Sequence, residues 1–516
     1  MWLTVKQKRS GEQMWSAKQS RVSILSTEVL LVVLLGGCRA VGPNYKPPEV
    51  PTPDAWHQEV TREINAETPQ LQAWWTQFND PVLEDLIRRA REQNLTVKQA
   101  LSVIRETRAA RGITSRRLQP TIDTNLSYTR TRGSEQVPPL SLLPPELGVE
   151  SEGLNVFGGS FDMGWELDVF GGIRRSIEAA DALIDVSIEG YRDILVTLFA
   201  EVGLNYLEVR TLQQRIQYAE KNIELQEETL RLAQSRFDSG IAGRLDPAQA
   251  ESHLANTEAA LPLLRLALHA TLYRLGVLLA QHPGGLEELL EVKPIPVPPE
   301  DVAVGIPAEL VRQRPDIRLA ERTLAAQTAQ VGVATSNLYP KFGLFGSLGF
   351  QTTKLSDMSG SATGFVTPLM SWNLFNRGRI KDQIRVEEER AEQAFLAYEN
   401  IMLAALAEVE TSMVSFWEEQ QRLAALSRAV TASELAVELV GILYQTGLVD
   451  FQNVLDTQRV LFLQQDQLAA SEGQVTKNLV SLYKALGGGW DAGPAPTASA
   501  SQPTSRASDP AGPGPD

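Results

Sequence analysis

The chain has 516 residues, of which 43% are hydrophobic and 22% are charged. This balance excludes a disordered chain, which has few apolar residues, and a polytopic helical membrane protein, which has few charged ones. No uninterrupted run of about 18 apolar residues occurs, so we expect no membrane-spanning helix. A β-barrel stays open, because its alternating strands give only a weak hydropathy signal. The formal net charge of −15 argues against binding to nucleic acid or to anionic lipid.

The N-terminus has the composition of a bacterial secretory leader. A basic region is followed by the short apolar run "VLLVVLLGG" at residues 29–37, and then by Cys38, the only cysteine in the chain. The sequence "LGGC" resembles a lipobox, in which the cysteine is lipidated after cleavage. We therefore predict a lipoprotein signal peptide at 1–37 and a covalent lipid on Cys38, with no disulfide and no further cofactor. The alternative is an unmodified cysteine in a leader that is removed.

The chain is predicted to contain an internal duplication. Pairing Gly240 with Gly447 also pairs Phe237 with Tyr444 at the same offset. Three further pairs of segments match near that spacing: "WELDVFGGIRR" with "WNLFNRGRI", "LQPTI" with "LYPKF", and "ALHATLYRLG" with "NLVSLYKALG". We therefore predict a first repeat at 81–291, a Pro-rich linker at 292–304 and a second repeat at 305–490. A period of about 200 residues is too long for a solenoid, so it indicates a duplicated domain.

Each repeat is predicted to have the same order of elements: a helix, two strands, a long helix, a glycine turn and a second long helix. In the first repeat we expect strands at about 120–132 and 155–169 and long helices at about 173–239 and 246–282. In the second repeat we expect strands at about 340–353 and 364–374 and long helices at about 379–446 and 453–486. Residues 491–516 are rich in Pro, Ala, Ser and Gly, which predicts a disordered tail.

The predicted strands have one apolar and one polar face. In the first strand, Ile122 and Leu126 alternate with Asp123 and Asn125. The same alternation recurs at 156–169 and 342–350, whereas 365–374 alternates poorly. This pattern is typical of a barrel with lipid outside and water inside, although an ordinary half-buried strand gives it too. Because a single lipid chain anchors a protein only weakly, we also expect further contact with membrane lipid.

The first long helix shows the strongest periodicity in the chain. Apolar residues recur at steps of three and four from Ile188 to Phe237, and only Asn205 and Gln226 interrupt the series. A sustained period of about 3.5 residues predicts a coiled coil with partner helices. No proline interrupts 173–238, so the helix is expected to be roughly 100 Å long.

Three segments resemble the outer-membrane efflux factors of the TolC/OprM type, including NodT-like lipoproteins: "VGPNYKPPEVPTPDAW" at 41–56, "WWTQFNDPVLEDLIRRAREQNLTVKQA" at 74–100 and "LVSLYKALGGGW" at 479–490. The resemblance covers about residues 35–490. It implies a mixed α+β membrane protein that forms a homotrimer, in which four strands per chain build a twelve-stranded outer-membrane β-barrel. A long periplasmic α-helical coiled-coil barrel continues the β-barrel. An equatorial domain surrounds the middle, and residues 38–80 are its N-terminal segment.

The resemblance also implies a function and partners. The protein would be the passive exit duct of a tripartite efflux pump of the RND type, passing drugs or other small solutes to the outside. Its partners would be a periplasmic adaptor protein, an inner-membrane transporter and outer-membrane lipid. It would lie in the cell outer membrane as a lipid-anchored protein that extends into the periplasm. Two alternatives are a type I protein-secretion channel and a periplasm-spanning coiled-coil scaffold without a pore.

The sequence offers little for an enzyme. The four histidines show no metal-ligand spacing with one another: His57, His253, His269 and His282. No GxSxG, P-loop or GxGxxG motif occurs. We therefore predict neither catalysis nor a metal site.

The turns between the long helices carry acidic residues with a predicted capping role. In the first repeat, Asp246 is expected at the N-cap, with Pro247 at N1 and Gln249 at N3, which is a capping box. In the second repeat, a cap at Asn453 would place Asp456 in the first helical turn, where the helix dipole favours a carboxylate.

The resemblance gives the second turn a further role. The segment "VLDTQR" matches the part of the family that narrows the periplasmic end of the channel, so Asp456 and Arg459 are candidate gate residues. Three copies of Asp456 around the trimer axis would form an acidic ring. The chain departs from the family pattern at Gln452, where a leucine one turn before the aspartate is expected. We therefore predict a more polar tip.

Two pairs of residues at the turns are candidate contacts for the adaptor. Gly240 and Gly447 are expected to end their helices, and the exposed turns around them, with Asp246 and Asp450, are what a partner hairpin could reach.

Tryptophans also fall at equivalent strand ends: Trp165 and Trp372 are candidates for an interfacial belt or for a core. Trp74 and Trp75 are predicted to pack in the equatorial region.

Overall fold

The computed structural model describes residues 40–49, 51, 53, 55–57, 64–65, 71–132, 154–299, 302–303 and 312–490. Three predicted features lie outside these residues: the leader at 1–37, the lipidated Cys38 and the tail at 491–516. The described chain is mostly α-helical, with one four-stranded antiparallel sheet and one two-stranded sheet.

The chain divides into two compact units. The first, the sheet unit, comprises Met1–Pro47, Arg108–Leu183 and Thr323–Ala394. The second, the hairpin unit, comprises Pro48–Thr107, Ile184–Arg322 and Phe395–Asp516. Each unit takes segments from both predicted repeats, so the duplication did not produce two separate bodies.

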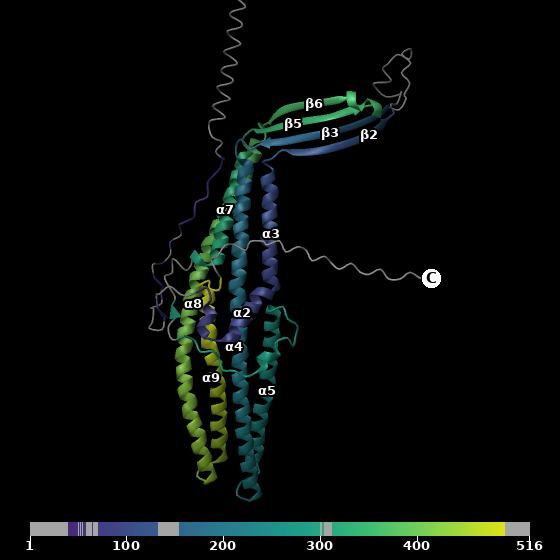
Figure 1. Ribbon diagram of the computed structural model, residues 1–516. Helices are drawn as coiled ribbons and strands as arrows, with labels where there is room; N and C mark the ends of the chain where they lie inside the picture. The colour runs from purple at the N-terminus through teal and green to yellow at the C-terminus, as the bar shows by residue number, and fades with distance from the viewer. Residues whose placement is uncertain are drawn as a thin grey trace, which may run out of the picture. The chain divides into compact units, whose positions relative to one another are not determined.

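The sheet unit contains four strands: β2 (Thr121–Thr131), β3 (Leu154–Leu167), β5 (Lys341–Thr352) and β6 (Ala362–Ser371). They are all antiparallel and lie in the order β2-β3-β5-β6 (Figure 1). The central pair, β3 and β5, joins the two repeats. A short 3-10 helix, η5 (Leu355–Gly360), lies between β5 and β6 in the chain.

The register confirms that the sheet has two different faces. Asp123, Asp162 and Ser347 are cross-strand partners, so their side chains share one face. Asp162 links β2, β3 and β5 on this face. Its carboxylate accepts hydrogen bonds from Asn125 Nδ2 at 2.6 Å, Ser160 Oγ at 3.0 Å and Ser347 Oγ at 2.6 Å. Ile122 and its partner Met163 lie on the opposite, apolar face, with Phe161, Leu126 and Leu348.

Equivalent tryptophans secure the two junctions between a helix and a strand. Helix α3 (Leu95–Arg116) precedes β2, and α7 (Pro315–Ser336) precedes β5. The indole of Trp165 donates to the backbone oxygen of Leu118 at 2.9 Å, and that of Trp372 donates to Leu338 at 3.1 Å. The repeats therefore share this contact as well as their sequence. Within the single chain, Trp372 is 48% exposed.

Four long helices form two hairpins. They are α4 (Gly172–Asp238) with α5 (Leu245–Leu278), and α8 (Arg377–Gln445) with α9 (Phe451–Ala485). The 67 residues of α4 span about 100 Å at 1.5 Å per residue. Within the hairpin unit the two hairpins lie side by side, with both turns at the same end (Figure 1).

The core of the hairpin unit is built around Trp74, in the 3-10 helix η1 (Trp74–Phe78). Its ring is fully buried and stacks on Tyr483 with centroids 5.8 Å apart. Trp75 contacts Phe199 edge to face at 5.1 Å. The prediction that both tryptophans pack is therefore confirmed.

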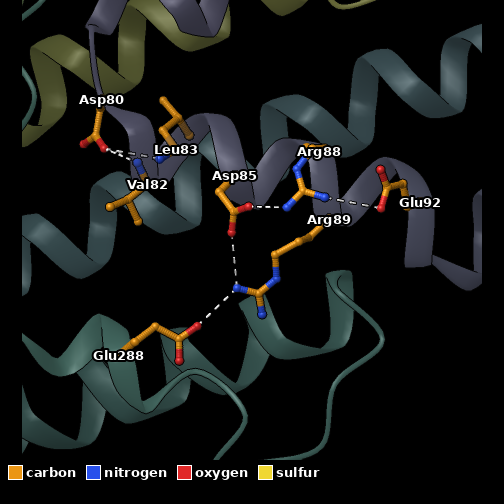
Figure 2. A network of polar contacts seen from close by, with 8 residues as sticks. All are labelled: Asp80, Val82, Leu83, Asp85, Arg88, Arg89, Glu92 and Glu288. Atoms are coloured by element: carbon orange, nitrogen blue, oxygen red, sulfur yellow. Dashed lines mark hydrogen bonds and ion pairs between the residues drawn. The ribbon is translucent and has the colours of Figure 1, made fainter.

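Helix α2 (Pro81–Gln93) is held to this core by its first turn and by its charges (Figure 2). The Asp80 carboxylate accepts from Val82 N at 2.8 Å and Leu83 N at 3.2 Å, which satisfies two helix N–H groups. Arg89 then links Asp85 to Glu288 of the 3-10 helix η4 (Glu287–Leu290), at 3.5 Å and 3.1 Å. The Arg89 side chain is 18% exposed, whereas Asp85 and Glu288 are 45% and 56% exposed, so solvent still screens this link.

Two details differ from expectation. The predicted linker at 292–304 includes a short strand, β4 (Val302–Ala303), which pairs in parallel with β1 (Ile64–Asn65). Among the described residues, α5 is long and apolar enough in composition to cross a membrane, although no such helix was expected. The charged Arg265 of α5 pairs with Glu220 of α4 at 2.9 Å, so we treat α5 as one arm of its hairpin.

Candidate functional site

The first turn, between α4 and α5, is a Schellman turn. Gly240 has φ +71°, a left-handed conformation that favours glycine. Its N–H donates to the Phe237 oxygen at 2.9 Å, and the next N–H, of Ile241, donates to Arg236 at 2.9 Å. These bonds satisfy carbonyl groups at the end of α4 that have no partner within the helix.

The second turn, between α8 and α9, repeats this geometry. Gly447 has φ +76°, its N–H donates to Tyr444 at 3.0 Å, and the N–H of Leu448 donates to Leu443 at 2.9 Å. The prediction that Gly240 and Gly447 end their helices is confirmed. A Cβ at either glycine would meet no atom within 4 Å, so both turns face open space.

The predicted caps are wrong at both turns. Helix α5 begins at Leu245 with Arg244 at the N-cap position, so Asp246 lies inside the first turn and no capping box forms. Helix α9 begins at Phe451 with Asp450 at the N-cap position, and its first turn contains no acid. Asp456 therefore lies beyond the first turn, and the helix dipole does not explain it. Both helices therefore start earlier than the local pattern suggested.

Asp246 instead takes part in a cluster that joins the two turns. Arg236 of α4 donates to the backbone oxygens of Tyr444 at 3.2 Å and Gln445 at 3.1 Å, at the end of α8. Its guanidinium also lies 4.7 Å from the centre of the Tyr444 ring. The Tyr444 hydroxyl then donates to Asp246 Oδ2 at 3.2 Å. We call Arg236, Tyr444 and Asp246 the tip cluster.

The tip cluster rests on a small apolar core. This core contains Ala233, Ala250, Tyr444, Phe451, Val454 and Leu455, and therefore residues from all four long helices. Tyr444 is 4% exposed. Burial raises the pKa of the Tyr444 hydroxyl, and the nearby charge of Asp246 raises it further, so the phenol stays protonated and able to donate. Sequence reasoning missed Arg236 and Tyr444 as functional residues.

The predicted gate residues lie together on α9. Gln452, Asp456 and Arg459 are all exposed, at a spacing that places them on one side of the helix. Asp456 and Arg459 form an exposed ion pair at 3.7 Å. The other side of the same segment is buried and comprises Phe451, Val454, Leu455 and Gln458. The structure thus brings the three predicted residues onto one exposed face.

Arg459 also affects the pKa of a histidine on α5. Burial lowers the pKa of His253, and the positive charge of Arg459 lowers it further. The His253 Nε2 atom is buried and has no hydrogen-bond partner among the described residues. The neutral imidazole is therefore the form that this site accommodates.

Above the tip, polar contacts connect α4 to α9. From the tip upward, they join Thr229 to Gln458 at 2.7 Å, Asn222 to Gln465 at 2.7 Å, Arg215 to Asp466 at 2.7 Å and Glu208 to Lys477 at 2.6 Å. The helices approach closely here, because a Cβ on Gly473 would collide with the side chain of Thr211. This seam is more polar than the apolar coiled coil predicted for α4.

Some buried polar atoms along α4 and α9 are unsatisfied, and Gln226 of α4 is the clearest case. Gln226 is 1% exposed, and neither its side-chain oxygen nor its nitrogen has a partner among the described residues. An unsatisfied buried polar group costs about 1–3 kcal/mol. This part of the seam is therefore less stable than an apolar one of the same size.

The remaining candidates do not form a metal site. Within the part of the chain that the structure describes, no group of three or more His, Cys, Asp or Glu side chains could hold a metal ion. His269 and His282 line a small hollow of about 110 Å³ with Tyr273 and Glu287. His253 does not line this hollow.

Comparison with known proteins gives one consistent result. The model of the family described as outer membrane efflux protein matches residues 86–281 and 306–488, one match in each predicted repeat. Nodulation protein T of Rhizobium leguminosarum bv. trifolii is 30% identical over 469 residues, covering 89% of this chain and 96% of its own. The pyoverdine export outer membrane protein OpmQ of Pseudomonas putida is 29% identical, covering 85% and 92%.

The fold is also similar to that of a solved channel. The structure of the outer-membrane channel OprN aligns with a TM-score of 0.80 at 32% identity, covering 87% of this chain and 99% of the other. The similarity therefore extends over both repeats, with the sheet and the hairpins included.

Proposed function

The chain belongs to the outer membrane efflux protein family, and we propose that three copies of it form the exit duct of a tripartite efflux pump. Members of this kind are outer-membrane efflux channels, and so is this chain. In the proposal the three sheets close a twelve-stranded barrel, and the paired hairpins continue it as a helical duct in the periplasm. The duct passes drugs or other small solutes and does no chemistry, while an adaptor and an RND-type transporter drive export.

Two features of the single chain support a homotrimer. Among the described strands, β2 and β6 each pair on one side only, and an unpaired strand edge is not tolerated in lipid. Helix α5 also exposes large apolar side chains: Leu263, Leu266, Tyr273 and Val277 are each at least half exposed. Such a surface is typical of an interface. Closure by neighbouring copies covers both.

The exposed face of α9 supports a gate. Around a three-fold axis, the Asp456 carboxylates would form an acidic ring that attracts cations. Gln452 lies one turn closer to the tip, where an apolar ring would exclude water and ions more strongly than an amide does. We propose that this pair of rings, with Arg459 next to the acid, sets the resting leak of the duct.

The turns support contact with an adaptor. Both glycines face open space, and the residues around them expose apolar side chains, with Ile241 and Leu245 at 66% and Leu448 at 73%. Exposed apolar residues on a turn are suited to a partner hairpin. We propose this contact for Gly240 and Gly447 and for the neighbouring Asp450. Asp246 already contacts Tyr444, so its part in adaptor binding is indirect.

The sequence at the N-terminus supports a lipid anchor and a location in the outer membrane. We propose that Cys38 carries lipid and holds the trimer in the outer membrane together with the barrel. Mass spectrometry of the mature N-terminal peptide tests the modification, and Cys38→Ser is the matched variant. Recovery of an unmodified Cys38 peptide from membranes would contradict it.

Conductance tests the gate. The purified trimer is inserted into planar bilayers, and the resting conductance is compared with that of Asp456→Ala and Gln452→Leu. We expect Asp456→Ala to reduce cation selectivity and Gln452→Leu to reduce the leak, because a leucine ring is less hydrated. Glu438→Ala, an exposed acid on α8, is the matched control. Unchanged conductance and selectivity in both variants would show that these residues do not form the gate.

A further inference from the structure

The polar face of the sheet carries an apolar hollow near its helical end. Its volume is about 440 Å³, within the range of small-molecule sites. Phe345 and Leu369 line it, together with Thr121, Glu166 and Lys341. The register places all five on the face that carries Asp123 and Asp162. In the proposed trimer this face lines the duct. The inference rests on the proposed function, because only a closed barrel places the hollow on the path of a solute.

Phe345 and Leu369 belong to the second repeat, and Trp165 of the first repeat also lines the hollow. Phe345 lies opposite Thr367, with Phe365 and Leu369 on the two diagonals, within reach of an aromatic ring. All three are about half exposed: Phe345 at 48%, Phe365 at 60% and Leu369 at 51%. They explain why β6 alternates poorly in sequence, because this strand has apolar residues on both faces.

Glycines make room for the Phe345 ring on the sheet. A Cβ on Gly164, its cross-strand partner, would lie 3.7 Å from Phe345 Cε1, and a Cβ on Gly343 would lie 3.4 Å from Cε2. The ring therefore leans over two positions that have no side chain. Because about half of Phe345 is exposed, the ring offers an apolar surface to a solute in the duct.

Two carboxylates lie on either side of this ring along β3: Glu166 lines the hollow, and Asp162 lies beyond its lining. On β3, Asp162 and Glu166 lie one position above and one below Gly164 on the same face, about 7 Å away along the strand. Asp162 is fixed by its three hydrogen bonds. The ammonium of Lys341 lies 4.0 Å from the carboxylate of Glu166 and partly offsets its negative charge. Arg117, which precedes β2, also lines the hollow. Negative charge therefore dominates beside Phe345 and toward Asp162, away from Arg117 and Lys341.

We propose that this hollow is a binding site for a lipophilic monocation. The cation would lie on the Phe345 ring between Asp162 and Glu166, where an aromatic face and carboxylates attract it together. Its apolar body would cover Phe365 and Leu369. The site would hold such a solute briefly on its way through the barrel.

Tetraphenylphosphonium is the probe for this site. Added on the barrel side of a single trimer in a bilayer, it is expected to block the current transiently. Tetramethylammonium has the charge without the apolar body, and triphenylphosphine oxide has the body with no net charge, so both should block far less. Equal block by all three compounds would overturn the proposal.

Four variants locate the block. Phe345→Ala should weaken it roughly five- to tenfold. Phe161→Ala, which changes a somewhat more exposed phenylalanine on the opposite face, should leave it unchanged. Glu166→Gln should weaken the block, and Lys341→Gln should strengthen it because a competing ammonium is removed. A gain of this kind cannot come from misfolding. Equal effects of Phe345→Ala and Phe161→Ala, or no gain with Lys341→Gln, would overturn the site.

A second measurement does not need current. Thr367→Cys lies opposite Phe345, and Thr129→Cys lies on the same face away from the hollow. Tetraphenylphosphonium should slow the reaction of a thiol reagent with Thr367→Cys only. Trimers that do not conduct would contradict the proposed duct function. Slower labelling of Thr367→Cys in the presence of the probe would still support the binding site. Equal rates with and without the probe would exclude the site even in a conducting trimer.

Discussion

The two helical turns have the same backbone and different side chains. Gly240 and Gly447 share a left-handed φ and the same pair of turn hydrogen bonds. At aligned positions, however, Arg236 corresponds to Leu443, Phe237 to Tyr444 and Asp246 to Asn453. The residues that differ are those that join the turns, since the arginine and aspartate of the first repeat contact the tyrosine of the second. Duplication supplied two equal turns, and divergence made them complementary.

The carboxylates show the same division. In the first turn Asp246 accepts from Tyr444 within the chain, whereas Asp456 of the second repeat lies on an exposed face and aligns with Gln249. The first repeat therefore uses its acid to hold the two hairpins together. The exposed acid of the second repeat, Asp456, instead pairs with Arg459 of its own helix.

Removal of Arg236 breaks this link and should have the largest effect. Arg236→Ala eliminates two hydrogen bonds from a charged group, worth about 1.5–3 kcal/mol each, and a cation–π contact. After partial relaxation we expect a local loss of roughly 3 kcal/mol. Amides at the end of α8 should then exchange with solvent about a hundredfold faster, measured by hydrogen exchange and mass spectrometry. The leak of the duct should rise with it.

The control for this change lies one and a half turns away. Arg231 is 66% exposed and makes only long ion pairs within its own helix, at 3.8 Å and 4.0 Å. Arg231→Ala should leave both exchange and leak near the original values. If the two variants behave alike, the tip cluster does not hold the turns together.

Much of this architecture was readable from local pattern. Strand faces follow from the alternation of Ile122 and Asp123, because a pleated strand has a period of two. The turns follow from Gly240 and Gly447, because a left-handed residue at the end of a helix favours glycine. Both signals depend on residues that are close in sequence, so no tertiary information is needed.

The tip cluster was not predicted, because its partners are far apart in the chain. Asp246 followed by Pro247 matches a cap, yet the carboxylate contacts Tyr444, 198 residues away. Arg236 reaches the same tyrosine across 208 residues. The one usable signal was the change from Arg236 to Leu443 between aligned repeats, at a position where the backbones are the same.

Substitution of each turn glycine by alanine tests whether the two turns have the same backbone conformation. Gly240→Ala and Gly447→Ala force a side chain into the left-handed region at about 1–2 kcal/mol, with no clash to add to it. The turn amides of Ile241 and Leu448 should therefore exchange about tenfold faster in the respective variants, by equal amounts. Gly243→Ala is the control, because Gly243 is in the first turn without a positive φ. Clearly unequal effects would show that the turns differ in backbone after all.

The smallest expected effect is a pH dependence that belongs to one repeat. His253 of α5 has no titratable counterpart, since the aligned residue of α9 is Val460. Its pKa is lowered from 6.5 by burial and by Arg459, so below that value the unfolded state binds more protons than the folded one. The packing of α5 on α9 is therefore fully stable above about pH 6.5 and loses stability as the pH falls toward the folded-state pKa.

This loss should appear as weaker hydrogen-exchange protection around residues 250–257 at about pH 5.5 than at about pH 7.5, after correction for intrinsic rates. His253→Gln should remove the difference, because glutamine does not titrate. His269→Gln changes an exposed histidine on the same helix and should preserve it. A pH dependence that survives His253→Gln would have to come from groups that the two repeats share, such as the carboxylates along the seam. It would then no longer distinguish the first turn from the second.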